Sequence, residues 1–332
     1  MPKFDRIAVF GCKATTLFLL DNLLIPYQVR HLITIGPDLG EKHDVADYFD
    51  LKETASASGM EVYRAKSYSL KNKEDQDYLK SLQLDLAFVV GWQRLLPSEV
   101  LAGLRIGAFG MHGSSMNLPL GRGRSPMNWS IIEGRQVFYT NLFRYDPGVD
   151  SGDVVDTFKF EIGPRDTAET MHFKNTLAMK FLIERNIERL VHDDFTTTPQ
   201  DTSIVPTYYP KRNPSDSLID WSMDVHALER FIRAVTRPFN GAFTYAGEQP
   251  VVIYDAQVFD LNEFGYSALA PGTVAAVFEN GKFLVKCFGG LLLVNACETK
   301  AEIRRGLQFH HNGQSINYFR RNELGYFDLA EE

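Results

Sequence analysis

The sequence predicts a doubly wound α/β domain with a mostly parallel sheet, followed by a small C-terminal β-barrel of the OB type. In the first half, short apolar runs alternate with helical patterns, which is typical of a parallel sheet covered on both faces. In the second half, apolar runs follow one another closely with turn residues between them, which favours an antiparallel barrel. The polar stretch between them predicts domains at 1–191 and 217–332 joined by a linker at 192–216.

The first domain opens with RIAVFG (6–11), a helical leucine pattern and the strand VRHLITIG (29–36). We expect the alternation to continue through a helix at 44–57, a strand at 60–65, a helix at 75–82, a strand at 84–91 and a closing helix at 166–191. Ligands bind at the carboxyl ends of such strands, so the glycine-containing loops 91–97 and 109–113 are candidate binding loops. The turn FGCK lacks the GxGxxG pattern and argues against a dinucleotide site.

The second domain begins with a predicted helix, VHALERFIRAV (225–235). Five apolar runs follow and are predicted as strands: 242–246, 251–259, 272–278, 282–288 and 291–298.

Composition excludes several classes of protein. The 332-residue chain carries a net charge of -7 at a pI near 5.7, which gives no general attraction to nucleic acid or anionic membranes. Cys12, Cys287 and Cys297 are odd in number and lack a CxxC pair, so we expect neither a disulfide framework nor a metal site, and we expect a cytoplasmic location. No apolar run is long enough for a membrane span, and the N-terminus reads as a strand.

One histidine has the setting of an acid–base group. His112 ends a predicted strand between Gly110 and Gly113, and the acidic loop DPGVDSGD (146–153) ends another. A carboxylate that orients an imidazole makes it a competent proton acceptor near neutral pH. From the spacing alone, a structural role for His112 is favoured over a catalytic one.

Several motifs together resemble the formyltransferases that use 10-formyltetrahydrofolate. They are HGS, LPLGRGRSPMNW, DPGVDSGD, the YYPKR to IDW connection and RPFNGAFTYAGEQPVVIYDAQV, and they extend over nearly the whole chain. GRGRSPMNW and FNGAFTYAG are most similar to the formyltransferase domain that acts on UDP-4-amino-4-deoxyarabinose and to related sugar-nucleotide N-formyltransferases. Methionyl-tRNA formyltransferase is a near relative. The resemblance implies a Rossmann-like catalytic domain with an OB-like domain after it.

The resemblance also implies roles for particular residues. The family's Asn-x-His triplet falls on Gly110, Met111 and His112, and its catalytic aspartate falls on Asp150. The residues implied to bind the folate cofactor are Gln93, Arg94 and Leu95 in one loop, Asp146, Pro147, Gly148, Val149 and Asp150 in a second, and Arg124. Without the resemblance, we would interpret Arg94 as a solvated loop charge and Arg124 as a member of a surface ion pair.

Gly110 departs from the family, because it stands where the family has an asparagine that donates to the oxygen of the reacting formyl group. Loss of one such donor costs roughly a hundred- to a thousandfold in rate. Asn117 could replace it, with Ser114 or Ser115 as weaker donors. Alternatively, a backbone amide approaches closely, or the protein only binds folate or a nucleotide sugar.

The resemblance thus implies transfer of a formyl group from 10-formyltetrahydrofolate to a nucleotide-linked amino sugar for surface polysaccharide such as lipopolysaccharide. His112 would accept the amine proton and Asp150 would orient it. Methionyl-tRNA is the alternative acceptor, but segment 36–50 and the C-terminal domain are both more acidic than basic. An acidic barrel could serve as a lid or as a homodimer contact. Trp92, Trp129 and Trp221 could stack on a ring, although core packing is favoured for Trp129 and Trp221.

Overall fold

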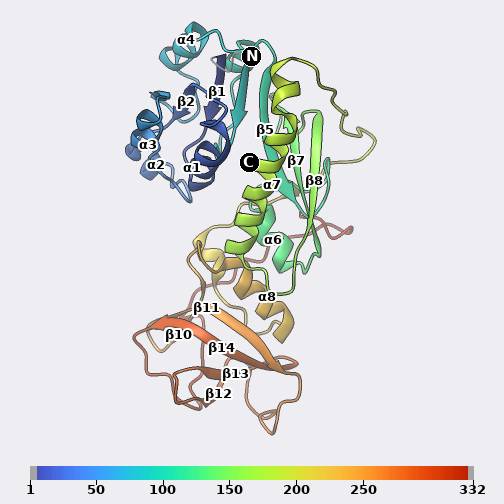
Figure 1. The fold of residues 1–332 in the computed structure, drawn as a ribbon. Coiled ribbons are helices and arrows are strands. Elements are labelled where there is room, and N and C mark those ends of the chain that lie inside the picture. The colour runs from blue at the N-terminus through green and yellow to red at the C-terminus, as the bar shows by residue number, and fades with distance from the viewer. Residues whose placement is uncertain (1–5, 328–332) are drawn as a thin grey trace. The chain divides into compact units, whose positions relative to one another are not determined.

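The computed structural model describes residues 6–327 and divides into two compact units made of interleaved segments (Figure 1). The first unit comprises Met1–Arg122, Tyr139–Lys159 and Lys174–Pro206. The second comprises Gly123–Phe138, Phe160–Phe173 and Thr207–Glu332. No helix within residues 6–327 combines the length and the apolar character that crossing a membrane requires.

Helices and strands alternate in the first part of the chain as the sequence predicts. In order, the elements up to the long helix are β1 (Ile7–Phe10), α1 (Ala14–Leu19), η2 (Leu20–Leu24), β2 (His31–Thr34), α2 (Pro37–Lys42), α3 (Lys52–Ala57), β3 (Glu61–Arg64), α4 (Lys73–Ser81), β4 (Leu86–Val89), α5 (Ser98–Ala102), β5 (Gly107–Ser114), β6 (Arg122–Gly123), α6 (Pro126–Ile132), β7 (Val137–Arg144), β8 (Val154–Glu161) and α7 (Ala168–Val191). The remaining elements are β9 (Tyr208–Tyr209), η3 (Pro214–Ser217), α8 (Val225–Val235), β10 (Ala242–Ala246), β11 (Gln249–Asp260), β12 (Val274–Val277), β13 (Phe283–Cys287) and β14 (Gly290–Thr299).

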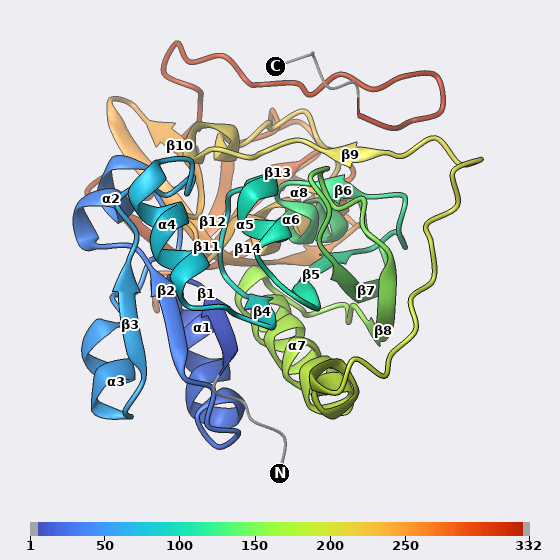
Figure 2. The same ribbon diagram turned by 90° about the horizontal axis from the view of Figure 1, so that it is seen from above.

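A seven-stranded sheet of order β3-β2-β1-β4-β5-β7-β8 is the main element of the first unit. The pairs from β3 to β5 are parallel, and β5 pairs with β7 antiparallel. Buried residues of α1, η2, α3 and α7 share one core with the strands, and those of α4 and α5 share another, so helices cover both faces (Figure 2). The predicted doubly wound sheet is confirmed.

The helix predicted at 44–57 is shorter in the structure. Residues 44–57 do not form a continuous helix, because α3 begins only at Lys52. Asp44 and Asp47 have φ values of 45° and 60°, in the left-handed region that a right-handed helix excludes. The backbone carbonyl of Asp47 instead accepts a hydrogen bond of 3.3 Å from the N–H of Ala14, so contact with a distant segment takes precedence over local helix formation.

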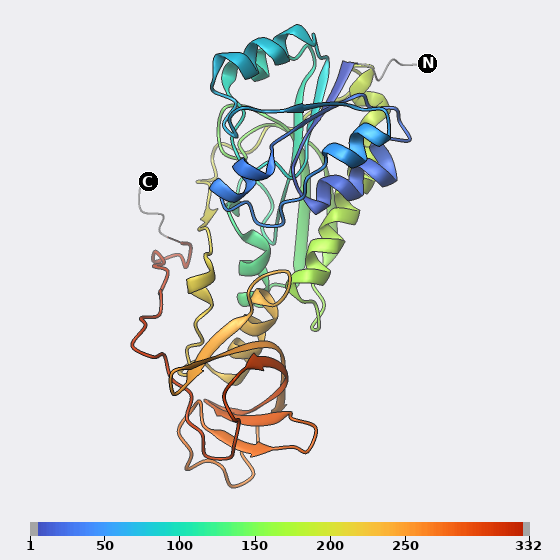
Figure 3. The ribbon, with the colours of Figure 1, turned by 90° about the vertical axis from the view of Figure 1, so that its left-hand side faces the viewer.

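The second unit contains a five-stranded antiparallel sheet of order β10-β11-β14-β13-β12, and all five predicted strands are present (Figure 3). Segment 306–310 connects its two edges. The N–H of Gly306 donates to Val274 O of β12 at 2.8 Å, and His310 exchanges two 3.0 Å backbone hydrogen bonds with Tyr245 of β10. This segment satisfies edge groups that would otherwise be unpaired, which closes the sheet into the expected small barrel.

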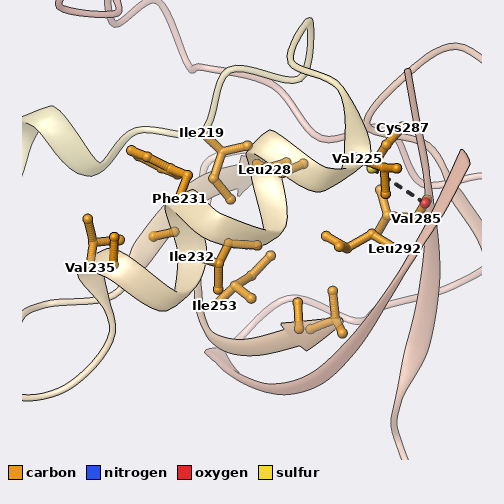
Figure 4. Packing of buried hydrophobic residues seen from close by; sticks show 14 of the residues in the cluster. Ile219, Val225, Leu228, Phe231, Ile232, Val235, Ile253, Val285, Cys287 and Leu292 are labelled. Atoms are coloured by element: carbon orange, nitrogen blue, oxygen red, sulfur yellow. Dashed lines mark hydrogen bonds between the residues drawn. The ribbon is translucent and has the colours of Figure 1, made fainter. Parts of the chain in front are cut away.

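Helix α8 supplies much of the core of the second unit (Figure 4). Asp224 caps it by accepting hydrogen bonds of 3.0 Å from the N–H groups of His226 and Ala227. Leu228 and Ile232, one turn apart, are fully buried and pack in one cluster with residues of the barrel strands.

The compact units do not follow the predicted boundaries at 191 and 217. Helix α6 belongs to the second unit, because Met127 and Ile131 pack in the same cluster as α8 and Asn128 Nδ2 donates to Ala234 O at 2.7 Å. Residues Lys174–Pro206 belong to the first unit, in which Thr198 exchanges two backbone hydrogen bonds with Val154 of β8. The predicted linker is therefore partly a structured extension of the sheet.

Candidate active site

His112 lies in β5 beyond the point where β4 ends. The pairing of β4 with β5 stops at Val89 and Gly110, whereas β5 continues beside β7 to Ser114. His112 therefore stands at the carboxyl edge of the parallel sheet, where ligands bind in this architecture. Its side chain is buried, with 7% of the residue exposed.

The contacts of the imidazole define its hydrogen positions. His112 Nε2 lies 2.7 Å from the backbone oxygen of Gly121, which can only accept, so Nε2 carries a hydrogen. His112 Nδ1 lies 3.3 Å from Asp150 Oδ2. Since neither a bare Nδ1 nor a carboxylate donates, this contact is attractive only when one proton lies between the two groups. The two groups are thus close enough for a proton to pass between them.

The loop that carries Asp150 is fixed from both sides. Asp150 itself has a φ of 50°, and Asp146 Oδ1 accepts from the N–H of Gly148 at 3.0 Å and from Ser151 Oγ at 2.6 Å. Gln200 Nε2 donates to the backbone oxygens of Asp150 and Gly152, each at 2.8 Å. These bonds hold a strained aspartate beside the histidine.

The second predicted loop follows β4 and rests on a buried tyrosine. The backbone N–H of Gln93 donates to the Tyr68 hydroxyl at 2.9 Å, and the Arg94 guanidinium lies 5.2 Å from the centre of the Tyr68 ring. Burial raises the pKa of Tyr68, so the hydroxyl stays neutral. Leu95 is 51% exposed, which leaves an apolar side chain at the surface of this loop.

The space beside Gly110 is filled by Tyr145. A Cβ placed on Gly110 would lie 2.7 Å from the Tyr145 hydroxyl oxygen and 2.8 Å from the ring carbon that bears it. No side chain fits at position 110 while Tyr145 keeps this position, so close approach is what requires glycine here. Burial raises the pKa of Tyr145 well above its ordinary value, and the charge of Asp150 raises it further.

Two other residues named from the sequence are described by their backbone hydrogen bonds. Asn117 is exposed and begins a turn in which its backbone oxygen accepts from the N–H of Leu120 at 2.9 Å. Arg124 belongs to the second unit, where its backbone N–H donates to Tyr209 O at 2.8 Å. Their catalytic and cofactor-binding roles stay predictions.

Sequence reasoning missed three residues of this site, namely Tyr68, Tyr145 and Gln200. Tyr145 directly precedes the acidic loop, which is a signal that could have drawn attention to it. Gln200 lies in the stretch interpreted as a linker, and Tyr68 lies between two predicted elements. Among the side chains of residues 6–327, no group of three His, Cys, Asp or Glu is positioned to hold a metal ion.

A histidine and a carboxylate in contact at the carboxyl edge of a doubly wound sheet define a candidate acid–base site. The family model of the formyl transferase domain matches residues 38–183, and that of the formyl transferase C-terminal domain matches residues 211–306. Together they cover most of the chain. The protein belongs to the formyl transferase family.

Individual relatives are distant. The bifunctional polymyxin resistance protein ArnA of Wigglesworthia glossinidia brevipalpis is 28% identical over 190 residues, which are 57% of this chain and 29% of ArnA, so the match spans less than a third of that relative. The N-formyltransferase of Helicobacter canadensis, solved with folinic acid and dTDP-3-aminofucose, has a TM-score of 0.62 at 18% identity, with coverage of 88% of this chain and 99% of that one. HypX of Aquifex aeolicus in complex with tetrahydrofolic acid has a TM-score of 0.61 at 17% identity, with coverage of 90% and 45%. These two structures share the fold.

Proposed function

We propose that this protein transfers the formyl group of 10-formyltetrahydrofolate to the amine of a nucleotide-linked amino sugar. The observation that carries the proposal is the His112–Asp150 pair, 3.3 Å apart at the carboxyl edge of the sheet in a chain of the formyl transferase family. The Helicobacter canadensis protein, which has the same fold, was solved with a folate and an amino-sugar nucleotide. A cytoplasmic location is part of the proposal, since all three cysteines are free thiols.

The loop after β4 fits a pterin ring. Among residues 6–327, no acceptor receives a hydrogen bond from the backbone N–H of Arg94 or of Leu95, so both remain available to a ring that carries amide-like acceptors. Leu95 and Val149, 51% and 42% exposed, offer apolar contact. We propose that Gln93 to Leu95 and Asp146 to Asp150 hold the folate, with Arg124 as a further contact.

The proton shared by His112 and Asp150 suits formyl transfer. In this reaction the amine nitrogen bonds to the formyl carbon, the bond from that carbon to folate N10 breaks, and one amine proton ends on N10. Because His112 Nε2 is committed to Gly121 O, exchange takes place on the side of Nδ1 and the carboxylate. We propose that the pair gives its proton to N10 and takes one from the amine.

A sugar acceptor suits the charges better than tRNA does. Segment 36–50 contains five acidic side chains against Lys42, and one of them, Asp50, is neutralised locally by Arg64 at 2.5 Å. The remaining acidic side chains would repel a phosphate backbone.

We also propose that the formylated sugar is used to make surface polysaccharide, lipopolysaccharide included.

The decisive experiment supplies 10-formyltetrahydrofolate with UDP-, dTDP- and GDP-linked amino sugars, and measures release of tetrahydrofolate and the N-formyl product. We expect consumption of the donor only when an amino sugar is present. Turnover with methionyl-tRNA alone would establish the alternative acceptor. Folate binding without turnover on any acceptor would contradict the enzymatic proposal.

A further inference from the structure

We propose that the Tyr145 hydroxyl is the hydrogen-bond donor to the oxygen of the reacting formyl group, in place of the asparagine that is absent at Gly110. This inference rests on the proposed formyl transfer and names the catalytic residue that the sequence leaves open.

The position of the hydroxyl matches that of the missing amide. Residues 110 and 112 are two apart on β5, so side-chain positions at Gly110 and His112 point to the same face of the sheet. An asparagine amide nitrogen lies two bonds from its own Cβ, at about 2.4 Å. The Tyr145 oxygen lies 2.7 Å from the Cβ position of Gly110. The hydroxyl of Tyr145, the residue after β7, thus lies about as far from this Cβ position as an asparagine amide would.

Tyr145 is held firmly in this position. Its backbone N–H donates to Ala108 O at 2.8 Å, which attaches it to β5 two residues before Gly110. Its ring packs edge-on against Phe143, with centroids 5.1 Å apart and planes at 87°. A donor that needs no rearrangement stabilises developing charge most effectively, and this tyrosine meets that condition.

The chemistry of the hydroxyl also suits the role. Among residues 6–327, no hydrogen bond from Tyr145 Oη to an acceptor is described, so the hydroxyl can donate to a bound substrate. When the amine attacks the formyl carbon, the carbonyl π electrons move to oxygen, and the Tyr145 O–H bonds to this oxyanion while keeping its proton. Collapse of the oxyanion reforms the carbonyl and expels N10, which takes its proton from the His112–Asp150 pair.

The absence of a side chain at Gly110 therefore leaves the space that the Tyr145 hydroxyl occupies. Asn117 offers the same chemistry, but it is exposed and starts a turn beyond the end of β5. Introducing any side chain at Gly110 would displace the hydroxyl. Replacing Gly110 by Asn in the native background should therefore lower activity, although it restores the family's residue.

The kinetic test is Tyr145→Phe, which removes the hydroxyl and leaves the ring against Phe143. We expect kcat/KM to fall by roughly a hundred- to a thousandfold, with the loss in kcat and little change in Tm. Tyr63→Phe is the matched control. It removes a hydroxyl that donates to Asp75 at 2.8 Å, and should lower stability while sparing transfer. Native-like kcat/KM in Tyr145→Phe together with a large loss in Asn117→Ala would overturn the proposal.

A second readout is independent of turnover and of the acceptor. The stable analogue 10-formyl-5,8-dideazafolate, labelled with 13C in the formyl group, is bound to wild type and to Tyr145→Phe. A hydrogen bond from Tyr145 should lower the carbonyl stretching frequency and move the 13C resonance downfield in wild type, and the shift should disappear in the variant. If the analogue binds with this shift but no amino sugar is formylated, the Tyr145 assignment stands and the acceptor proposal fails. Equal shifts in both proteins, or no binding, overturn the assignment.

The final test exchanges the donor. Tyr145→Ala removes the ring that blocks position 110, and Gly110→Asn in that background places an amide in the vacated space. We expect the double variant to recover part of the rate lost in Tyr145→Ala, which would make the two changes strongly non-additive. Additive losses would show that the two positions do not share one function.

Discussion

The two units differ in whether the indole N–H groups of their buried tryptophans have hydrogen-bond acceptors. Trp92 and Trp221 are equally buried, with 7% and 6% of each residue exposed. In the barrel unit, Trp221 Nε1 donates to Thr244 Oγ1 at 3.0 Å, and Trp129 Nε1 likewise donates to Pro210 O at 2.9 Å. Within residues 6–327, no acceptor is found for Nε1 of Trp92, the residue that directly precedes Gln93–Leu95 in the first unit.

The same contrast extends to other polar groups. In the sheet unit, the Tyr145 hydroxyl has no acceptor among residues 6–327 and Asp150 adopts a strained φ of 50°. In the barrel, His311 Nε2 contacts Ile219 O at 2.9 Å, and Lys286 Nζ donates to Glu263 at 2.5 Å. Unfilled hydrogen-bonding capacity reduces stability, and the buried side-chain atoms without a hydrogen-bond partner among residues 6–327 all lie in the first unit. This difference is consistent with the proposed active site in the first unit.

The largest expected effect is on catalysis in the sheet unit. His112→Ala should lower the transfer rate by roughly a hundred- to ten-thousandfold, because the variant cannot exchange a proton with the amine and N10. Binding of folinic acid, measured by calorimetry, should change little. His226→Ala, an exposed histidine of the barrel unit, is the control and should be active. Equal loss of binding and transfer in His112→Ala would mean that the ring is structural.

In the second unit, which contains the barrel, the largest expected effect of a substitution is on the free energy of unfolding. Leu228→Ala removes a fully buried side chain of α8 and should lower the free energy of unfolding by about 2–5 kcal/mol, measured by denaturant titration. Leu261→Ala, at a residue 57% exposed, should change it by less than about 0.5 kcal/mol. A small effect at Leu228 would contradict the assignment of the core to this helix.

A smaller effect is expected where the acidic loop is anchored. Gln200→Ala removes two hydrogen bonds that hold the backbone at Asp150 and Gly152. Positioning residues act through geometry, so we expect kcat to fall by about tenfold with a much smaller change in folate affinity. Gln257→Ala, exposed on the barrel, should leave both unchanged. Unaltered kcat in Gln200→Ala would show that the loop holds Asp150 without this side chain.

The smallest effect tests the tryptophan comparison itself. Substitution by Phe shortens both side chains equally, but only Trp221→Phe also removes a hydrogen bond and leaves Thr244 Oγ1 without its donor. We expect Trp221→Phe to cost about 1 kcal/mol more than Trp92→Phe in unfolding free energy. Equal costs would mean that Trp92 Nε1 has a partner in solution, such as a bound water.

Much of the fold could be predicted because its signals are local. The strands 84–91 and 242–246 and the helix 225–235 are defined by runs and periods within their own residues. The helix predicted at 44–57 was wrong for the opposite reason, because hydrogen bonds with a distant segment determine the backbone there. The His112–Asp150 pair was inferred from the family resemblance, and the structure brings the two side chains together.

The sequence by itself determined the alternation of strands and helices and the strands of the barrel, since each is a property of neighbouring residues. It also showed a glycine at position 110, where the family resemblance implies an asparagine. Only the tertiary structure decided what stands beside that glycine. Tyr145 is 35 positions further along the chain and reaches Gly110 because β5 and β7 pair antiparallel, with Gly110 opposite Phe143. Pairing between strands is a long-range event that no local pattern encodes, and it is the pairing that places a tyrosine hydroxyl beside Gly110.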